Sequence, residues 1–209
     1  MMDLSEKQWV SHTVFHPFEG FEDLRWKKAG SLKISFVIVF LFFIAKIVHS
    51  RLYAFHFCNN YDKLFNIVPF FVNSILLFTV WVIGNWSVCT LLDGEGSLKR
   101  ICIYSSYSLI PHIVSLFITT LMSHFLVYDE FIFLQLVYYG GLLWSALLIF
   151  NAIKAVHQYS FGKTVFAFIL TVAAMFAIMC LIIILMSLMQ KVVLFIYSIY
   201  TEIQYRTRV

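Results

Sequence analysis

Charged side chains are missing from four long windows of this chain, and their absence constrains the fold more than any other feature. No Asp, Glu, Lys or Arg occurs in residues 64–92, 101–128, 131–153 or 164–190. A helix needs about 20 predominantly apolar residues to cross the hydrocarbon core of a bilayer, and each window is long enough. A fifth apolar run extends from Leu32 to about Tyr53, and we expect Lys46 inside it to snorkel outward. The pattern predicts an all-α, polytopic membrane protein with five transmembrane helices.

The composition supports the same class of protein. Of the 209 residues, 61% are hydrophobic and only 12% are charged, whereas a soluble domain carries about 25% charged residues. The net charge of +4 is small and dispersed, so binding of nucleic acid is not expected. The four cysteines form no C-x-x-C pair, which argues against a disulfide framework and against a cysteine-based zinc site.

The distribution of basic residues predicts the orientation in the membrane. If the chain crosses five times, nine Lys and Arg residues fall on the side of the N-terminus: Lys7, Arg25, Lys27, Lys28, Lys33, Lys99, Arg100, Lys154 and Lys163. Five fall on the other side: Arg51, Lys63, Lys191, Arg206 and Arg208. Cytoplasmic loops of membrane proteins carry an excess of Lys and Arg. We therefore expect the N-terminus in the cytoplasm and the C-terminus outside.

The segment HPFEGFEDLRWKKAGS, residues 16–31, concentrates charge directly before the first span. Its acidic residues precede its basic residues, as the dipole of a helix beginning near Pro17 favours, and its apolar residues share one helical face. We expect an N-terminal amphipathic helix lying along the membrane interface. The expected interface residues are Phe18, Phe21, Leu24, Trp26, Lys27 and Lys28.

These features predict three parts in the chain. Residues 1–31 form a cytoplasmic segment with the interfacial helix, and residues 32–191 form the five-helix membrane domain. Residues 192–209 repeat apolar side chains at helical spacing, so they are expected to form an amphipathic helical extension.

Polar residues gather near the cytoplasmic ends of the second and fourth spans. The set is Asn85, Trp86, Asp93, Gly94, Gly96, Asn151, His157, Tyr159, Ser160 and Lys163. One interpretation is a site for a partner or ligand. The other, which we favour, is a network that locks the fold, with the asparagines bridging helices, Asp93 capping a turn, and Lys163 pairing with Asp93 or Glu95. The same network could still present a docking surface.

The third span contains Pro111, which should kink it, and His112, which we expect to be a neutral hydrogen-bonding partner at the kink. Neither H-E-x-x-H nor G-x-S-x-G nor a phosphate-binding P-loop occurs, and no pair of carboxylates lies within a span. We therefore expect no catalytic residues and no cofactor. Possible metal ligands on the outer side are His49, His56, Cys58, Asp62 and His124. Their spacing matches no known ligand pattern, so a metal site is not expected.

Four motifs, in this order and spacing, resemble the Yip family of Ypt/Rab-interacting membrane proteins, in particular its compact bacterial members. They are HPFEGFEDLRWKKAGS before the first span, WVIGNWSVCTLLDGEGSLK at the end of the second, YSLIPH in the third and HQYSFGKT after the fourth. The resemblance covers roughly His16 to Arg206.

The resemblance implies a non-catalytic adaptor or scaffold in the bacterial plasma membrane. Its partners would be the lipid bilayer and another membrane protein or a second copy of the chain. The alternative is an accessory or transport component associated with a carbohydrate importer of the ABC type, because bacterial genes of this kind often lie beside such importers.

Overall fold

The computed structural model describes residues 6–57 and 65–207, and within these ranges the chain is helical without any strand. The elements are α1 (Glu6–Phe15), α2 (Gly20–Trp26), α3 (Leu32–Leu52), η1 (Phe55–Phe57), α4 (Val68–Phe71), η2 (Val72–Leu76), α5 (Leu77–Leu91), α6 (Leu98–Ser108), α7 (Ile110–Ser123), η3 (Tyr128–Glu130), α8 (Phe131–His157) and α9 (Phe161–Thr207). Five helical segments are long and apolar enough to cross a membrane: Leu32–Leu52, Val68–Leu91, Leu98–Ser123, Tyr128–His157 and Phe161–Thr207. The all-α fold with five candidate spans is confirmed.

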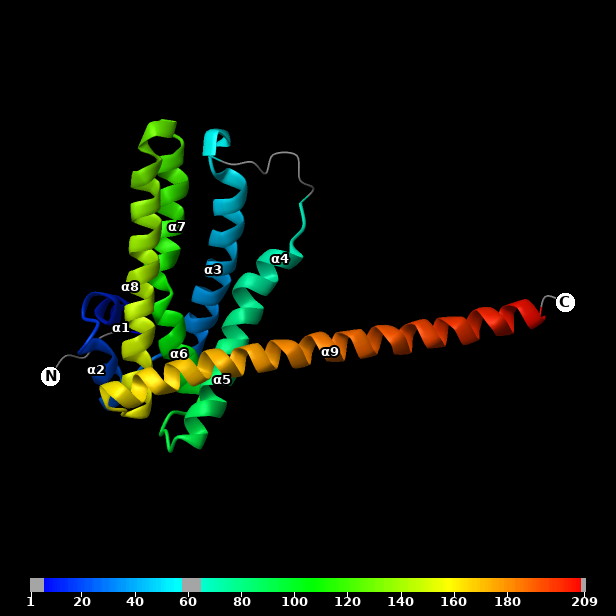
Figure 1. Cartoon of the computed structure of the whole chain (residues 1–209). Helices are drawn as coiled ribbons and strands as arrows, with labels where there is room; N and C mark the ends of the chain where they lie inside the picture. The colour runs from blue at the N-terminus through cyan, green and yellow to red at the C-terminus, as the bar shows by residue number, and fades with distance from the viewer. Residues whose placement is uncertain (1–5, 58–64, 208–209) are drawn as a thin grey trace.

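Helices α3, α7 and α8 run side by side and form the body of the bundle (Figure 1). The second span is tilted beside them and contacts α3 through α4 and η2, whereas α5 packs against α6 and α9. One end of the bundle carries α2, the α5–α6 loop and the α8–α9 loop, and we call it the α2 end. The opposite end carries η1 and η3, and we call it the η3 end. The 27 residues of α8 make it about 40 Å long, about 10 Å more than the hydrocarbon core of a bilayer. Part of the bundle therefore stands outside the hydrocarbon.

The third span is interrupted at Leu109, directly before Ile110 and Pro111, so that it consists of α6 and α7. Proline lacks an N–H donor and is tolerated only in the first turn of a helix, which is where it lies in α7. The backbone N–H of His112 donates to Ser145 Oγ on α8 over 3.0 Å. The neighbouring helix thus satisfies a backbone donor that the break exposes.

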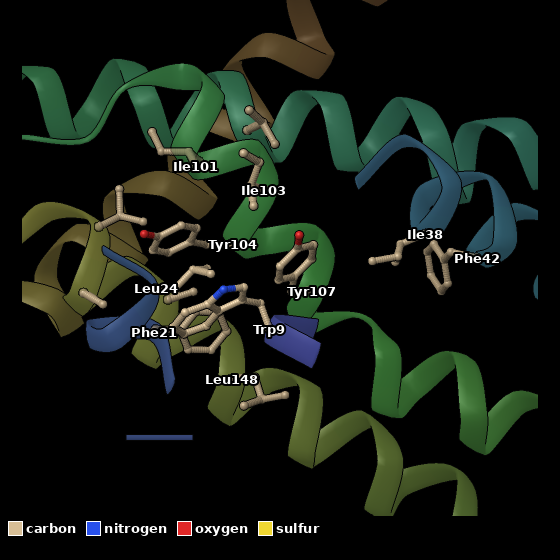
Figure 2. Close-up of a cluster of buried hydrophobic side chains, with 14 of the residues drawn as sticks. Trp9, Phe21, Leu24, Ile38, Phe42, Ile101, Ile103, Tyr104, Tyr107 and Leu148 are labelled. Carbon is tan, nitrogen blue, oxygen red and sulfur yellow. The ribbon is translucent and has the colours of Figure 1, made fainter. Parts of the chain in front are cut away.

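One face of the N-terminal segment packs on the protein, and contact of its exposed face with the membrane stays a prediction. Phe21 and Leu24 are fully buried, against Tyr104 and Tyr107 of α6 and beside Trp9 of α1 (Figure 2). The expectation that these two side chains face lipid headgroups is wrong, because full burial of a large apolar side chain in a core is worth about 1.5–3 kcal/mol. Of the expected interface residues, Phe18 and Trp26 are 75% and 78% exposed, and Lys27 and Lys28 are also exposed.

The segment is a pair of short helices rather than one helix from Pro17. Helix α2 begins at Gly20, and α1 precedes it. A methyl group on Gly20 would lie 2.8 Å from the Cα of Thr13, so only glycine permits this close approach of α1 and α2. His12 and Asp23 form an ion pair across the same contact, with 3.1 Å between Nε2 and Oδ2 when the histidine is protonated.

Helix α9 differs from the other spans in length and direction. Its 47 residues make it about 70 Å long, and it leaves the bundle at a steep angle after crossing α5 (Figure 1). Only Thr164, Ala167 and Thr171 of this helix are buried, on the face towards α5. No break occurs at residue 191, so the residues we assigned to an extension continue the same helix as far as Thr207. A crossing that places the C-terminus outside stays a prediction.

Candidate functional site

The α5–α6 loop begins with a residue in the left-handed conformation. Asp93 has φ of +56°, and the N–H of Gly94 donates to the carbonyl of Cys89 over 2.8 Å. Aspartate tolerates this backbone conformation better than most residues. The Asp93 side chain makes no hydrogen bond within the described part of the chain, so the expectation of a side-chain cap is wrong. Its backbone turns the chain, and its carboxylate stays exposed.

The two glycines of this loop lie directly on the end of α8. A methyl group on Gly94 would lie 2.4 Å from Nδ1 of His157 and 2.5 Å from the hydroxyl of Tyr159. A methyl group on Gly96 would lie 2.4 Å from Cγ1 of Val156. These distances are shorter than any real carbon contact, so glycine is required at both positions. The loop is fixed against the last turn of α8.

A chain of buried side chains joins three helices beneath the loop. Nε2–H of His157 donates to Oδ1 of Asn85 over 3.2 Å, and the Asn85 amide donates to Thr171 Oγ1 over 3.3 Å. His157 and Asn85 are 2% and 1% exposed. Because Asn85 lies on α5, His157 on α8 and Thr171 on α9, this chain ties all three helices together. Nδ1 of His157 is the one buried side-chain nitrogen or oxygen without a partner in the described ranges.

Tyr159 closes the cluster from the α8–α9 loop. Its hydroxyl bonds the carbonyls of Cys89 and Leu92, at 3.1 and 3.2 Å, and its ring stacks on His157 with 5.3 Å between centroids. Burial raises the pKa of Tyr159 well above its usual range, so it stays a neutral hydrogen-bond donor. The ammonium of Lys163 lies 4.5 Å from the centre of this ring.

Arg25 links the N-terminal segment to the same cluster. Its Nη1 donates to the carbonyls of Ala155 and Val156, both at 2.8 Å, and its Nη2 pairs with Glu95. The carbonyls at the end of α8 have no partner within that helix, so Arg25 caps it. Its side chain is only 14% exposed.

Three sequence expectations, for Lys163, Asn151 and Trp86, need correction here. Lys163 pairs with neither Asp93 nor Glu95 among the described contacts, because Arg25 occupies Glu95 and the Tyr159 ring receives Lys163. Asn151 is buried but does not bridge helices: it donates to the carbonyl of Leu147 in its own helix.

Trp86 is 40% exposed on the side of α5 and lies outside the cluster. Arg25 and Thr171 belong to the cluster and were missed. Nothing in the sequence distinguishes Thr171 from the other residues of its charge-free span. Arg25 has the same local pattern as the neighbouring cations that were expected at the membrane interface.

The remaining candidates lie elsewhere. His112 is buried in the middle of the bundle, where its ring meets Tyr138 edge-on at 5.4 Å. His49 bonds Thr120, and His124 bonds the carbonyl of Leu52. In the described ranges, no group of three His, Cys, Asp or Glu side chains could hold a metal ion, and Cys58 and Asp62 lie outside those ranges.

The geometry of the α2 end is therefore that of a hydrogen-bonded clamp. His157 faces an amide rather than a nucleophile, and Ser160 is exposed on the loop. The clamp fixes the α5–α6 loop, α2 and the start of α9 relative to one another. The side chains that it leaves exposed are Asp93, Glu95, Ser160 and Lys163.

The comparisons with known proteins agree with this architecture. The Yip1 domain model matches residues 11–200, which is nearly the whole chain. No curated protein and no solved structure matches it. The matched range begins in α1 and ends in α9, so it includes the first four candidate spans, most of the fifth, and the clamp at the α2 end. The chain belongs to the Yip family and is an integral, multi-pass membrane protein.

Proposed function

We propose that this protein is a non-catalytic adaptor or scaffold that binds partner membrane proteins through the α2 end. Yip family members are in general non-enzymatic membrane proteins, which supports this class of function. The observation that carries the proposal is the clamp itself. Apart from Nδ1 of His157, its buried polar groups are paired inside the protein, while Asp93, Glu95 and Lys163 stay exposed on a loop surface that the clamp holds rigid.

A rigid, charged loop surface suits protein binding. Ordering a flexible loop on association costs free energy, and a loop that is already ordered avoids that cost. Exposed charges of both signs select the partner and its orientation more than they add affinity. The clamp thus supports docking of a protein whose surface offers complementary charges.

The proposal includes an orientation. The excess of Lys and Arg, nine against five, favours the α2 end in the cytoplasm of a bacterium and the η3 end outside. In a variant lacking the native cysteines, a cysteine at Lys99 should react only with a reagent on the cytoplasmic side, and one at Asp129 only from outside. Gly96 is unsuitable for this test because a side chain there meets His157 and Val156. The reverse labelling pattern would overturn the orientation.

The function is tested by cross-linking in intact membranes, followed by affinity capture and identification of the proteins attached. The double variant Asp93→Asn with Lys163→Ser removes exposed charge at the α2 end, and Asp129→Asn removes exposed charge at the η3 end as a control. We expect a partner that is lost with the double variant and kept with the control. Equal recovery with all three chains would contradict docking at the α2 end.

The identity of the captured protein decides between the two functions. A cytoplasmic or membrane protein that binds without a transporter supports the adaptor. A stoichiometric carbohydrate importer would replace the adaptor with the transport component, and cross-links only between copies of this chain would make it a self-assembling scaffold.

A further inference from the structure

A second set of polar side chains lines a cavity at the η3 end, between α3, α7 and α8. Its volume is about 390 Å³, within the range of roughly 300–1,000 Å³ that is usual for sites of small molecules. The polar side chains of the lining are His49, Ser50, Tyr53, Thr119, Gln135, Tyr138 and Tyr139. No carboxylate lines it.

Several of these polar groups have no partner in the protein. Elsewhere in the spans, hydroxyl groups donate to the carbonyl one turn earlier, as in Ser35, Thr79 and Thr171. By contrast, Ser50, Gln135, Tyr138 and Tyr139 make no side-chain hydrogen bond to any other described residue. Unpaired polar groups inside a membrane are costly unless something polar meets them. The cavity therefore offers hydrogen-bond donors to a ligand.

The cation of Lys46 does not line the cavity, but it lies on the same face of α3, about one turn nearer the α2 end than His49 and Ser50. Lys46 precedes His49 and Ser50 by three and four residues, so the three side chains share one stripe of the helix. Its ammonium does not snorkel outward. It lies 5.3 Å from the ring centre of Phe42, one turn further into the bundle, so that expectation is wrong.

Within the described residues, Lys46 has no carboxylate partner. An unpaired cation inside a span marks a functional site by default. A negative group bound above it, towards the mouth of the cavity, would compensate its charge.

The mouth of the cavity has the opposite character. Phe57 stacks on Tyr128 and on Phe131, with ring centres 6.2 and 5.7 Å apart, and Tyr53 meets Phe57 edge-on at 6.0 Å. The exposed carboxylates of Asp129 and Glu130 follow Tyr128 in η3. Aromatic rings beside carboxylates are the usual environment for a bound ammonium group.

We propose that this cavity binds a zwitterionic headgroup, with its phosphate towards Lys46 and His49 and its ammonium at the aromatic mouth. A purely anionic headgroup would meet Asp129 and Glu130, and an uncharged ligand would leave Lys46 without a counter-ion. Lysine and hydroxyl donors are common ligands of phosphate. In a phospholipid the phosphate lies nearer the hydrocarbon than the ammonium does, which matches the order of the groups along the cavity. The same chemistry occurs in the soluble compound phosphoethanolamine.

The test is native mass spectrometry of the full chain, freed of lipid in detergent and titrated with three probes. These are phosphatidylethanolamine, phosphatidylglycerol and free phosphoethanolamine. We expect one phosphatidylethanolamine to stay bound, with phosphatidylglycerol weaker by on the order of tenfold. Tight binding of free phosphoethanolamine would also support the site and identify a soluble ligand. Equal retention of the two lipids, with no binding of the soluble probe, would overturn the proposal.

Two variants place the ligand in the cavity. Lys46→Met and Gln135→Leu keep the side-chain volume and should each weaken phosphatidylethanolamine binding by on the order of tenfold. Thr79→Val removes a hydroxyl from the exposed face of α5 and serves as the matched control. The melting temperature without lipid verifies that each variant is folded. Folded variants that bind the lipid as tightly as the control does would place it elsewhere and contradict the proposal.

Discussion

The two ends of the bundle differ in whether their polar side chains are hydrogen-bonded to other protein groups. At the α2 end, Asn85 and His157 are buried, Arg25 is mostly buried, and all three are bonded to protein groups from other parts of the chain. At the η3 end, Gln135 and Tyr138 line a cavity and make no side-chain hydrogen bond to the described part of the protein. Paired groups of the first kind stabilise the fold, and unpaired groups in a cavity are free to bind a ligand. The difference assigns structure to one end and small-molecule binding to the other.

The largest expected effect separates packing of the N-terminal segment on protein from packing on lipid. Phe21→Asp places a carboxylate in the core beside Tyr104, and its cost should exceed the roughly 3–5 kcal/mol typical of deleting a buried phenylalanine. Phe18→Asp alters a side chain that is 75% exposed and should change little. The measurement is the free energy of unfolding by SDS in mixed micelles. A similar loss of unfolding free energy in both variants would contradict packing on the protein and favour packing of the segment on the membrane surface.

Arg25→Ala should have the next largest effect, because it leaves the Val156 carbonyl uncapped, the Ala155 carbonyl with only the Gln158 amide, and Glu95 unpaired. Hydrogen bonds of charged groups contribute about 1.5–3 kcal/mol, so we expect a loss of that order and faster proteolysis between α2 and α3. The control is Lys33→Ala, which alters an exposed cation nearby. If both variants are cleaved at the rate of the native chain, Arg25 does not hold the segment.

Gly94→Ala tests the contact of the α5–α6 loop with α8. The added methyl group would meet His157 and Tyr159 at 2.4 and 2.5 Å and the Cys89 carbonyl at 2.8 Å, so the loop must move. Overpacking of this kind costs about 1–3 kcal/mol. Gly162→Ala adds the same group where no atom lies within 4 Å and should not destabilise the protein. The measurement is the melting temperature of each variant. Equal melting temperatures for the two variants would mean that the α5–α6 loop is not packed tightly against α8.

The smallest effect on stability is expected for Asp93→Asn, although it should reduce partner binding. Asparagine adopts the left-handed conformation at least as well as aspartate, and the carboxylate makes no hydrogen bond among the described residues. The melting temperature should therefore change little, while recovery of a cross-linked partner falls. A large drop in melting temperature would mean that Asp93 belongs to the clamp.

The sequence was sufficient for the spans because four of them are long windows without charge and the first is an apolar run with few charges. The helices begin and end within a few residues of those windows, except that α9 continues past residue 190 to Thr207. The sequence also placed the loop residues of the α2 end near one another, since the two loops lie on one side of any five-span arrangement. It did not reveal which of these side chains contact each other. Arg25 and Glu95 are 70 residues apart, and a cation that caps a distant helix has the same local pattern as one that faces headgroups.

Two further errors have the same physical origin. Hydrophobic periodicity identifies which face of a helix is apolar but does not tell whether protein or lipid covers it, so Phe21 and Leu24 were assigned to the membrane. Likewise, snorkelling of Lys46 depends on which way the side chain points. Side chains of a helix point towards its N-terminus, which for α3 is the inward direction. The cavity at the η3 end combines side chains from three helices and leaves no local signal in the sequence.

The contrast between the two ends is tested most directly by one matched pair of variants, each measured twice. Asn85→Ala removes a paired group at the α2 end, and Gln135→Leu removes an unpaired one at the η3 end. The first measurement is the free energy of unfolding in lipid-free detergent, and the second is the amount of phosphatidylethanolamine retained.

We predict that Asn85→Ala loses about 1–3 kcal/mol of stability and keeps the lipid, because it leaves the buried N–H of His157 without an acceptor. Gln135→Leu should keep its stability and lose the lipid. Loss of stability in Gln135→Leu together with an unaffected Asn85→Ala would contradict the assignment of structure to the α2 end and of ligand binding to the η3 end.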